Sequence, residues 1–430
     1  MGLNSMGEII PVPVGGLEKP ASCPRTILCM DLEIRPMDLS SQETFPLRIA
    51  QYMHRVDFED GGPPRAVVDL SRVLHERGHE VTLVTTDARD VPEEWNNQGS
   101  GPEVLVLPQP ALPGSMFKAA QLAPMKDLLG RLDVMQLHGP WERANAQLGK
   151  LARAARVPYV ISLRGMLDDW CMTQGGLKKR LYLKLAGRKL LEGAAYVHCT
   201  ADDELAQSGK WFPRGRGRVV PNLIDLEPYG SLPGPEEARQ AYSFLADGPT
   251  LLFLSRIHVK KGIEHLIEAA RRLGESGTPV QVAIAGSGDD DYVDKLRQQV
   301  ESAGLGERVH FLGHVGGSLK YSLYQAADVF VLPTSQENFG FVQFEAMACG
   351  TPVMTTNLVD TWREIVDSGG GVAVDQNAAA IVAGLQPLLD QPEQREVMGR
   401  LGREWVLKEL AVDTIAGRLE AMYTDAAAGL

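Results

Sequence analysis

The chain of 430 residues is longer than one hydrophobic core usually supports, which predicts two domains. Its 44% hydrophobic and 23% charged residues are typical of a folded globular protein and exclude disordered and fibrous classes. The net charge of −12 argues against a nucleic-acid-binding protein with a generally basic surface, although it is compatible with a local basic patch. Five cysteines without a CxxC pair indicate reduced thiols, and no apolar run has the roughly 20 residues that span a bilayer, so we expect a cytoplasmic protein, soluble or peripheral.

Short apolar runs alternate with segments of helical periodicity along nearly the whole chain. The runs that predict strands in the first half are Thr26–Ile34, Val81–Thr86, Asp133–Leu137, Val157–Leu163 and Ala195–Cys199. Those in the second half are Leu251–Ser255, Val280–Ala285, Val309–Leu312, Val329–Leu332 and Val353–Thr356. Segments between them, such as Ile263–Leu273, carry apolar residues at helical spacing. The alternation predicts an α/β fold of doubly wound parallel sheets with helices on both faces.

A stretch rich in proline and glycine, Pro221–Pro249, is typical of a connection between domains. We therefore expect a first domain over residues 1–225 and a second over residues 226–411, with a C-terminal helix at 412–430 that completes the first. The segment Arg35–Asp60 has weak periodicity. Two alternatives stay open for this segment: a loop or short helices that cover a cleft, or an inert insertion.

Gly61 and Gly62 precede a helix that is predicted to run to about Arg77. Such a turn lets the backbone approach a ligand, and the helix start offers N–H groups to an anion, although a plain turn has the same pattern. The helix also contains an HExxH match at His75 and His79. Because Gly78 is expected to end the helix between them, we interpret this match as accidental and expect no metal site.

Ser255–Gly262 closes a predicted strand and opens a helix, with Arg256 and Lys261 in the turn. Ligands of open α/β sheets bind beyond the carboxyl ends of strands. Two cations and a helix dipole there suit a diphosphate. A solvated surface loop is the alternative that this segment alone leaves open.

Two glutamates lie eight residues apart in the segment Pro333–Val353. Glu337 is expected in a loop after a strand, and Glu345 about one and a half turns into the next helix. The first-turn amides of Phe341 and Val342 can donate to phosphate oxygens. Because carboxylates repel phosphate, we expect Glu337 to contact sugar hydroxyls and Glu345 a ribose. Spacing alone also fits an exposed loop acid and a helix-start acid.

Together these segments resemble the retaining glycosyltransferases of family 4, the glycosyl transferases group 1, which have the GT-B fold of two Rossmann-like domains facing each other across a cleft. The resemblance rests on the E-x7-E string from Glu337 to Val353, Ser255-Arg256 with Lys261-Gly262, Gly61-Gly62 and Val220–Asp225, in the family's order. It implies transfer of a hexosyl unit from a nucleotide-diphosphate sugar to a hydroxyl acceptor. The anomeric configuration would be retained, no metal or other cofactor would be needed, and the departing phosphate oxygen would take the acceptor proton.

The resemblance also implies roles for individual residues. The expected donor-binding residues are Gly61, Gly62, Arg256, Lys261, Val315, Glu337, Asn338, Phe339, Gly340, Phe341, Val342 and Glu345, and the expected catalytic residues are Glu337, Arg256, Lys261 and His138. Val315 would offer its backbone to the base. His138 stands where the family places a sugar-contacting histidine, and a histidine satisfied by loop backbone is the alternative. Leu223 and Asn338 depart from the family's usual glycine and small residue, and Asn338 bears on which donor sugar is accepted.

On the acceptor side, Arg164-Gly165-Met166-Leu167 and the basic segment Leu177–Leu191 resemble members that build polysaccharides on lipid carriers. Arg164 is the candidate acceptor-facing residue. In the basic segment, leucines interleave with lysines and arginines, so contact with the inner face of an anionic membrane and a solvated helix face are both open. The expected partners are a nucleotide-sugar donor and a saccharide or lipid-linked acceptor, and no nucleic acid.

Other functions fit parts of the pattern. A nicotinamide dehydrogenase requires GxGxxG, but Asp291 occupies the place of the third glycine after Gly286-Ser287-Gly288. A sugar-nucleotide epimerase and a non-catalytic nucleotide-sugar-binding protein of the same fold stay open.

Overall fold

The computed structural model describes residues 46–96, 100–110 and 115–429. The strand predicted at Thr26–Ile34 and the first part of the segment Arg35–Asp60 lie outside the described residues.

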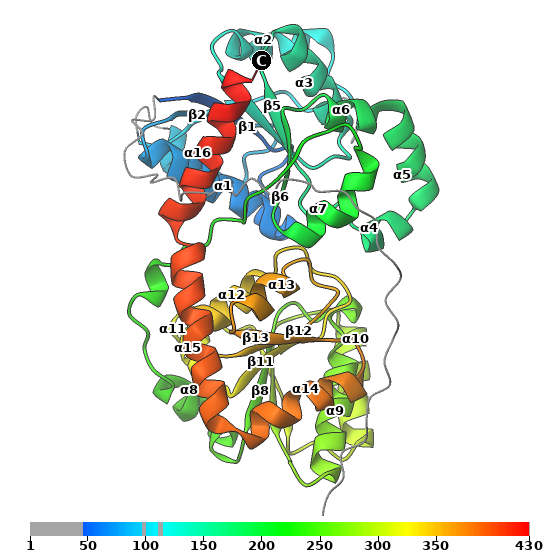
Figure 1. The fold of residues 1–430 in the computed structure, drawn as a ribbon, viewed down its shortest axis with the longest axis vertical. Coiled ribbons are helices and arrows are strands. Elements are labelled where there is room, and N and C mark those ends of the chain that lie inside the picture. Colours follow the sequence, from blue (N-terminus) through cyan, green and yellow to red (C-terminus); the bar gives the residue numbers. More distant parts are fainter. Residues whose placement is uncertain (1–45, 97–99, 111–114, 430) are drawn as a thin grey trace, which may run out of the picture. The chain divides into compact units, whose positions relative to one another are not determined.

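Seven parallel strands form the first sheet, in the order β3-β2-β1-β4-β5-β6-β7 (Figure 1). They are β1 (Arg48–Tyr52), β2 (Glu80–Thr85), β3 (Glu103–Val106), β4 (Val134–His138), β5 (Tyr159–Ser162), β6 (Tyr196–Cys199) and β7 (Gly217–Val219). The predictions for β2, β4, β5 and β6 are confirmed. β3 and β7 were not predicted, because β3 is only half-buried and β7 has just three residues.

β1 corrects the prediction for the segment that ends at Asp60, where a loop or an insertion was expected. It lies in the middle of the sheet and pairs with both β2 and β4. Its polar Gln51 is fully buried, which interrupts the apolar pattern. The Gln51 side chain is satisfied by Tyr423, to which its Nε2 donates at 3.1 Å, and by His138, whose Nε2 lies 2.9 Å from its Oε1. Long-range hydrogen bonds thus allow a polar residue in a central strand.

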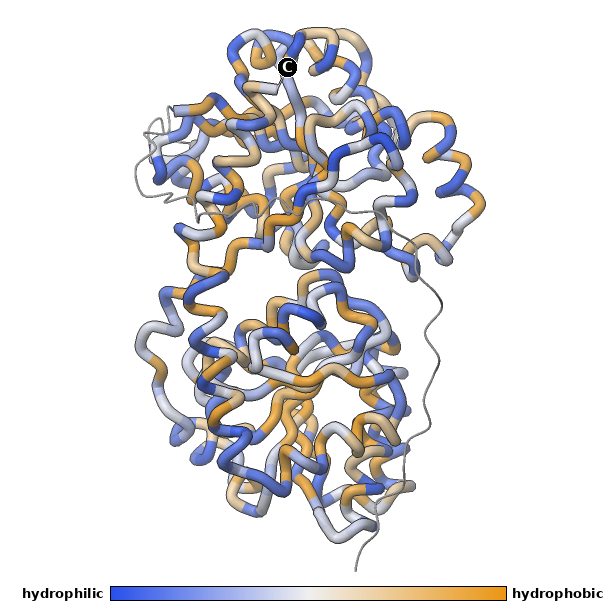
Figure 2. Tube along the Cα trace, viewed as in Figure 1, coloured by the Kyte–Doolittle hydropathy of each residue, from blue (hydrophilic) through white to orange (hydrophobic). Residues whose placement is uncertain are grey.

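Six parallel strands form the second sheet, in the order β10-β9-β8-β11-β12-β13. They are β8 (Thr250–Leu254), β9 (Gln281–Ala285), β10 (Val309–Gly313), β11 (Val329–Leu332), β12 (Val353–Thr356) and β13 (Gly371–Val374). All but β13 were predicted. β9 and β11 are buried along their whole length, and the strands of this sheet stand out as hydrophobic in Figure 2.

Helices connect the strands. Those that accompany the first sheet are α1 (Gly62–Glu76), α2 (Ala123–Leu129), α3 (Arg143–Ala154), α4 (Asp169–Thr173), α5 (Gly176–Tyr182), the π-helical turn η5 (Leu183–Gly187), α6 (Arg188–Glu192) and α7 (Asp202–Ser208). Those of the second are α8 (Glu236–Ala241), the turn η9 (Val259–Lys261), α9 (Ile263–Glu275), α10 (Asp290–Ser302), α11 (Gly317–Ala326), α12 (Phe341–Ala348), α13 (Trp362–Asp367), α14 (Ala378–Asp390) and α15 (Pro392–Glu409). In Figure 1, α9, α10 and α14 lie on one side of the second sheet and α8, α11 and α15 on the other, which confirms the predicted α/β class.

The last helix, α16 (Val412–Ala428), follows α15 but packs against α1, β4 and β5 of the first sheet. Its Tyr423 is fully buried, and the hydroxyl donates to Gln136. Glu420 accepts hydrogen bonds from Arg77 at 2.6 Å and lies 3.1 Å from His79 Nε2. The end of the chain is therefore part of the core beneath β1 and β4.

Candidate functional site

Each sheet has one point at which consecutive connections leave in opposite directions. It lies between β1 and β4 in the first sheet and between β8 and β11 in the second. Ligands of doubly wound sheets bind beyond the carboxyl ends of the strands at such points. β4 ends at His138, and the loops after β1, β8 and β11 contain the glycine turn, the Arg256–Lys261 turn and Glu337, respectively. The topology therefore brings the segments singled out by sequence to the expected edges.

A cavity of ≈ 360 Å³, which we call the central cavity, lies among these loops. Its lining consists of Asp60, Gly61, Gly62, Pro63, Ala66, Arg164, Asn222, Ser255, Arg256, Lys260, Lys261, Gln336, Glu337, Asn338, Phe339, Gly340, Phe341 and Val342. Residues of both sheets contribute. Apart from Val315, Glu345 and His138, all predicted site residues line it.

Lys261 and Glu337 form an ion pair at the wall of the central cavity. Lys261 is 4% exposed and its ammonium group donates to the Glu337 carboxylate. The loops that carry them are joined by a hydrogen bond from Ser335 N to Lys260 O of 2.7 Å. Gly262 permits this approach, since its φ is +65° and a Cβ there would collide with the carbonyl oxygen of Pro333. The pair fixes a cation and a carboxylate at one place.

Arg256 differs from Lys261, because its side chain is exposed to the cavity and makes no hydrogen bond or ion pair with any described residue. Opposite the basic turn, α12 begins after Gly340, whose φ of +70° directs the chain into the helix. Phe341 and Val342 stand in its first turn, where backbone N–H groups have no partner within the helix. A free cation, a buried cation and a helix start therefore face one space, an arrangement that suits an anion.

Glu345 lines a second cavity of ≈ 780 Å³, which we call the flanking cavity. This cavity adjoins the central cavity, because Gly62, Ala66 and Phe341 line both. Its Oε2 accepts from Lys320 Nζ at 3.1 Å and from Tyr324 OH at 3.0 Å. Both donors bind the same oxygen, which leaves the other oxygen for a hydroxyl donor. The two glutamates therefore serve adjoining spaces.

Arg164 lines the central cavity from the first sheet in an unusual backbone conformation, with φ of +56°. It is buried; its Nη1 donates to Asn222, and its Nη2 lies 3.4 Å from His138 Nδ1. Its Nε has no partner among the described residues. Burial lowers the pKa of Arg164 to about 10, so the group stays charged at neutral pH.

His138 and Val315 line neither the central nor the flanking cavity. His138 is buried behind Arg164, with Nε2 2.9 Å from Gln51 Oε1. Burial, and secondly the charge of Arg164, lower its pKa well below 6.5, so the ring is neutral. Donation from Nε2 to Gln51 leaves the Nδ1 lone pair for Arg164. Val315 is buried in the loop after β10, and its predicted contact with a base stays a prediction.

Several residues around the site were not predicted. Lys260 donates to Gln336 at 3.2 Å, and its position beside Lys261 was the one signal that pointed to it. Asp360 is buried between Asn338 Nδ2, at 3.0 Å, and Gln207 Nε2, at 2.8 Å. Burial raises the pKa of Asp360 to about 8, so it is mostly protonated at neutral pH. No sequence pattern indicates this group, because Gln207 is remote in the chain.

Asn338, which departs from the family pattern, also links the two sheets. Its Oδ1 accepts from Thr200 Oγ1 at 3.1 Å, while its Nδ2 donates to Asp360. Asn338 therefore connects the loops of the two halves as well as lining the central cavity.

The two histidines of the HExxH match do not lie on one helix, since His75 is in α1 and His79 follows it. Helix α1 ends at Glu76, and Gly78 has a φ of +92°. Leu47 N donates to His79 Nδ1 at 3.1 Å, and His79 Nε2 lies 3.1 Å from Glu420 Oε1. Among residues 46–96, 100–110 and 115–429 no cluster of three metal-ligating side chains occurs, and no helix is long and apolar enough to cross a membrane.

The chain matches two family models. "Glycosyl transferases group 1" covers residues 235–405, and "Glycosyl transferase 4-like domain" covers residues 61–223. The chain is 29% identical to the uncharacterized glycosyltransferase MJ1607 of Methanocaldococcus jannaschii, over 84% of this chain and 95% of that one. It is also 29% identical to the phosphatidyl-myo-inositol mannosyltransferase of Mycobacterium leprae, over 80% of this chain and 88% of that one.

Solved structures share the architecture. Alr3699/HepE of Anabaena, in complex with UDP, superimposes with a TM-score of 0.71 at 19% identity, over 88% of this chain and 100% of that chain. At this identity the likeness establishes the fold. Since the two family models together span both sheets and the architecture is that of GT-B proteins, the chain belongs to the glycosyl transferases group 1, with a glycosyl transferase 4-like first half, and is a glycosyltransferase.

Proposed function

We propose that the protein transfers a hexosyl unit from a nucleotide-diphosphate sugar to a hydroxyl acceptor, with retention of the anomeric configuration and without a metal ion. The observation that carries this proposal is the central cavity, where Arg256, Lys261 and the start of α12 face the Gly61-Gly62 turn. These groups are suited to a pyrophosphate, whose charge grows as it leaves the sugar. The residues 1–225 with the C-terminal helix would form the acceptor side, and residues 226–411 the donor side.

The donor is proposed to lie across both cavities. Its diphosphate would contact Arg256, Lys261 and the amides of Phe341 and Val342. The ribose would reach the free oxygen of Glu345 in the flanking cavity, whereas the sugar would meet Glu337 and Arg164. The neighbour from Anabaena that binds UDP and the mannosyltransferase relative support a nucleotide-sugar donor of this kind.

Proton transfer is proposed to use the departing phosphate oxygen as the base. Two carboxylates line the central cavity, Asp60 and Glu337. Glu337 is bound by Lys261, and Asp60 lies 3.8 Å from Arg55. Neither is therefore an unpaired base, which supports transfer on one face of the sugar with Arg256 and Lys261 stabilising the leaving group.

A lipid-linked acceptor at an anionic membrane is proposed from the surface of α5 and η5. Leu177, Leu181 and Leu185 follow one another at helical spacing and are 85%, 56% and 68% exposed. Lysines and arginines flank them at 178–180 and 184. An exposed apolar stripe with basic neighbours is the pattern of a helix that rests on an anionic bilayer. The phosphatidyl-myo-inositol mannosyltransferase relative supports such an acceptor.

Thermal-shift screening against UDP-, GDP- and ADP-hexoses tests the donor, since a ligand at 100 times its Kd stabilises by about 2.7 kcal/mol. The stabilising donor is then offered with lipid-linked saccharides, with and without EDTA, and the product's anomeric proton is read by NMR. Arg256→Ala should abolish the shift and the transfer, whereas Arg297→Ala, on a remote exposed surface, should keep both. Inversion or EDTA sensitivity contradicts the proposed mechanism, epimerisation of the free donor indicates the epimerase, and binding without turnover indicates a sensor.

A further inference from the structure

Helix α7 of the first half contacts the second half through hydrogen bonds between side chains. Asp203 Oδ2 accepts from Trp362 Nε1 at 2.6 Å, and Asp203 Oδ1 accepts from Arg363 Nε at 2.9 Å. One turn further along α7, Gln207 Nε2 donates to Asp360 Oδ1 at 2.8 Å. Asp203 is thereby paired with a cation, whereas Asp360 is bound by a neutral amide.

Asp360 joins this contact to the loop that lines the central cavity. Its backbone N–H donates to Glu337 O at 2.9 Å, and its Oδ2 lies 3.0 Å from the amide of Asn338. Glu337 and Asn338 both line the central cavity. Asn338 in turn contacts Thr200 of the first half at 3.1 Å. Asp360 therefore fixes the loop that carries Glu337 and connects that loop to the first half.

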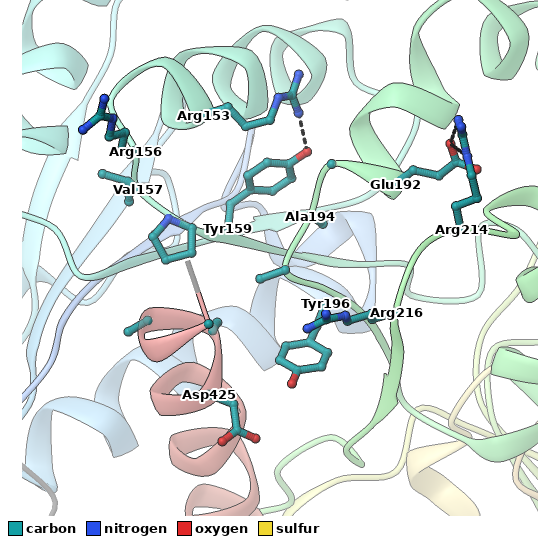
Figure 3. A pocket seen from close by; sticks show the side chains of 16 residues that line it. Arg153, Arg156, Val157, Tyr159, Glu192, Ala194, Tyr196, Arg214, Arg216 and Asp425 are labelled. Carbon is teal, nitrogen blue, oxygen red and sulfur yellow. Dashed lines mark hydrogen bonds and ion pairs between the residues drawn. The ribbon is translucent and has the colours of Figure 1, made fainter.

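No cation balances a charge on Asp360. The residue is 3% exposed, and no lysine or arginine among the described residues forms an ion pair with it. Glu192 shows the usual arrangement of a carboxylate, since Arg214 donates to it at 2.6 Å and this hydrogen bond lowers the pKa of Glu192 (Figure 3). Burial, and secondly the charges of Glu204 and Asp168 in the first half, instead raise the pKa of Asp360 to about 8.

The hydrogen bonds around Asn338 are all satisfied when Asp360 carries a proton. Thr200 has one hydroxyl proton, but its Oγ1 lies 3.0 Å from Glu204 Oε2 and 3.1 Å from Asn338 Oδ1. A carboxylate is the stronger of these two acceptors. Because an amide fits the same space with its oxygen and nitrogen exchanged, Asn338 can turn its nitrogen to Thr200 and its oxygen to Asp360. Thr200, Asn338 and a protonated Asp360 then each donate to a different acceptor.

We infer that Asp360 is a positioning residue: as a neutral acid it holds the loop of Glu337 and Asn338 against helix α7, and so keeps Glu337 in place in the central cavity. Loss of its proton puts a negative charge opposite Glu204 and Asp168 of the first half. The contact then loosens, and the loop is no longer fixed. The effect on catalysis rests on the proposed function, whereas the contact between the halves does not.

Other ionisable groups close to Asp360 do not compensate for this charge. Burial raises the pKa of the Cys199 thiol in β6 well above its ordinary value, so the thiol stays neutral. Arg363, three residues further along the chain, donates to Asp203. The proton on Asp360 is therefore the group that sets the charge of this contact.

The pH dependence of transfer tests the inference with variants that fix the protonation state. Asp360→Asn imitates the neutral acid, since its amide can donate to Asn338 and accept from Gln207. In the parent, kcat should fall about tenfold between about pH 7 and about pH 9, as expected when one buried polar contact is lost. Asp360→Asn should show no such fall. Asp360→Leu should be about tenfold slower than the parent at pH 7, without a further fall at higher pH.

Hydrogen exchange tests the contact itself, without donor or acceptor. At about pH 9 the backbone amides of residues 336–340 and of α7 should exchange faster in the parent than in Asp360→Asn, whereas at about pH 7 the two should agree. Because both proteins are compared at the same pH, the intrinsic pH dependence of exchange cancels. Asp367→Asn, which removes an exposed carboxyl group from α13, is the matched control and should behave as the parent does.

Equal exchange in the parent and in Asp360→Asn at the higher pH overturns the inference, and so does the same alkaline fall of kcat in both proteins. Faster exchange in the parent with kcat unchanged would show that the contact does not position Glu337, which also overturns it. Absence of transfer with every donor refutes the proposed function instead, and hydrogen exchange of residues 336–340 then decides on Asp360.

Discussion

The two halves of the molecule contribute to the central cavity in different ways. The second sheet presents charged groups directly, with Arg256 unpaired and Lys261 bound to Glu337. The first sheet presents Arg164, which rests on the buried, neutral His138. Charges at the cavity wall can act on a ligand, whereas a buried polar network holds one side chain in place. This difference fits the proposal that the second half binds the donor and the first half the acceptor.

The largest expected effect comes from removing the buried cation of the second half. Lys261→Met should reduce kcat by about 10²–10³, as expected when one fixed stabiliser of a developing anion is lost. Lys260→Met, which removes a neighbouring lysine bound to Gln336, should reduce it less than tenfold, by the size of a partly exposed contact. Steady-state kinetics with the donor identified by thermal shift measures both. Equal losses in the two variants would mean that the ion pair of Lys261 and Glu337 has no special role.

The buried hydrogen bonds that join Tyr423 to Gln51 and Gln136 should contribute to the free energy of unfolding. Tyr423→Phe removes the hydroxyl that donates to Gln136 and accepts from Gln51, and it leaves two buried amides without that partner. We expect the free energy of unfolding to fall by about 1–3 kcal/mol. Urea denaturation followed by tryptophan fluorescence measures the change. Tyr292→Phe, which loses a hydrogen bond to Glu264 in the second half, is the matched comparison.

Replacing His138 tests whether the first half acts through Arg164. His138→Phe removes the acceptor beside Arg164 Nη2. Since one hydrogen bond to a charged group is worth about 1.5 kcal/mol or more, kcat should fall about tenfold. The Kd of the donor should stay within about twofold, because His138 lines neither cavity. A large loss of donor affinity with kcat unchanged would show that His138 contacts the donor instead.

Titration separates the halves by the sign of their pH dependence. The pKa of Asp360 is raised to about 8 by burial, above the value of about 4 in an unfolded chain. The folded state then holds the extra proton, so the stabilisation is present below about pH 4 and lost as the pH rises to about 8. The free energy of unfolding should change by at most about 1.4 kcal/mol per pH unit in this range. Asp360→Asn should remove this pH dependence, as measured from the midpoints of urea denaturation between these pH values.

Titration of His198, in the first half, gives a pH dependence of stability with the opposite sign. Burial, and secondly Arg164, lower its pKa to about 4, below the unfolded value of about 6.5. The unfolded state therefore takes up the proton first, and stability present above about pH 6.5 is lost as the pH falls to about 4. His198→Gln should flatten the midpoints in this acid range and leave the alkaline range unchanged. An alkaline effect of the same variant would refute the separation of the halves.

Much of the fold follows from local patterns. β8, β9 and β11 each contain four apolar residues in a row, and the segment from Leu332 to Val353 combines a strand end, a loop, a helix and a glycine stop. β1 did not follow, because Gln51 breaks its pattern and is satisfied by Tyr423, more than three hundred residues away in the chain. Asp360 was missed for the same reason, since Gln207 is its partner.

The sequence by itself determined the α/β class, the basic turn at Arg256–Lys261 and the two spaced glutamates, because each rests on periodicity or on neighbours along the chain. Tertiary structure decided that Lys261 is paired with Glu337 and that His138 lies behind Arg164. The physical reason is that burial and charge pairing depend on groups that meet only when the sheets assemble.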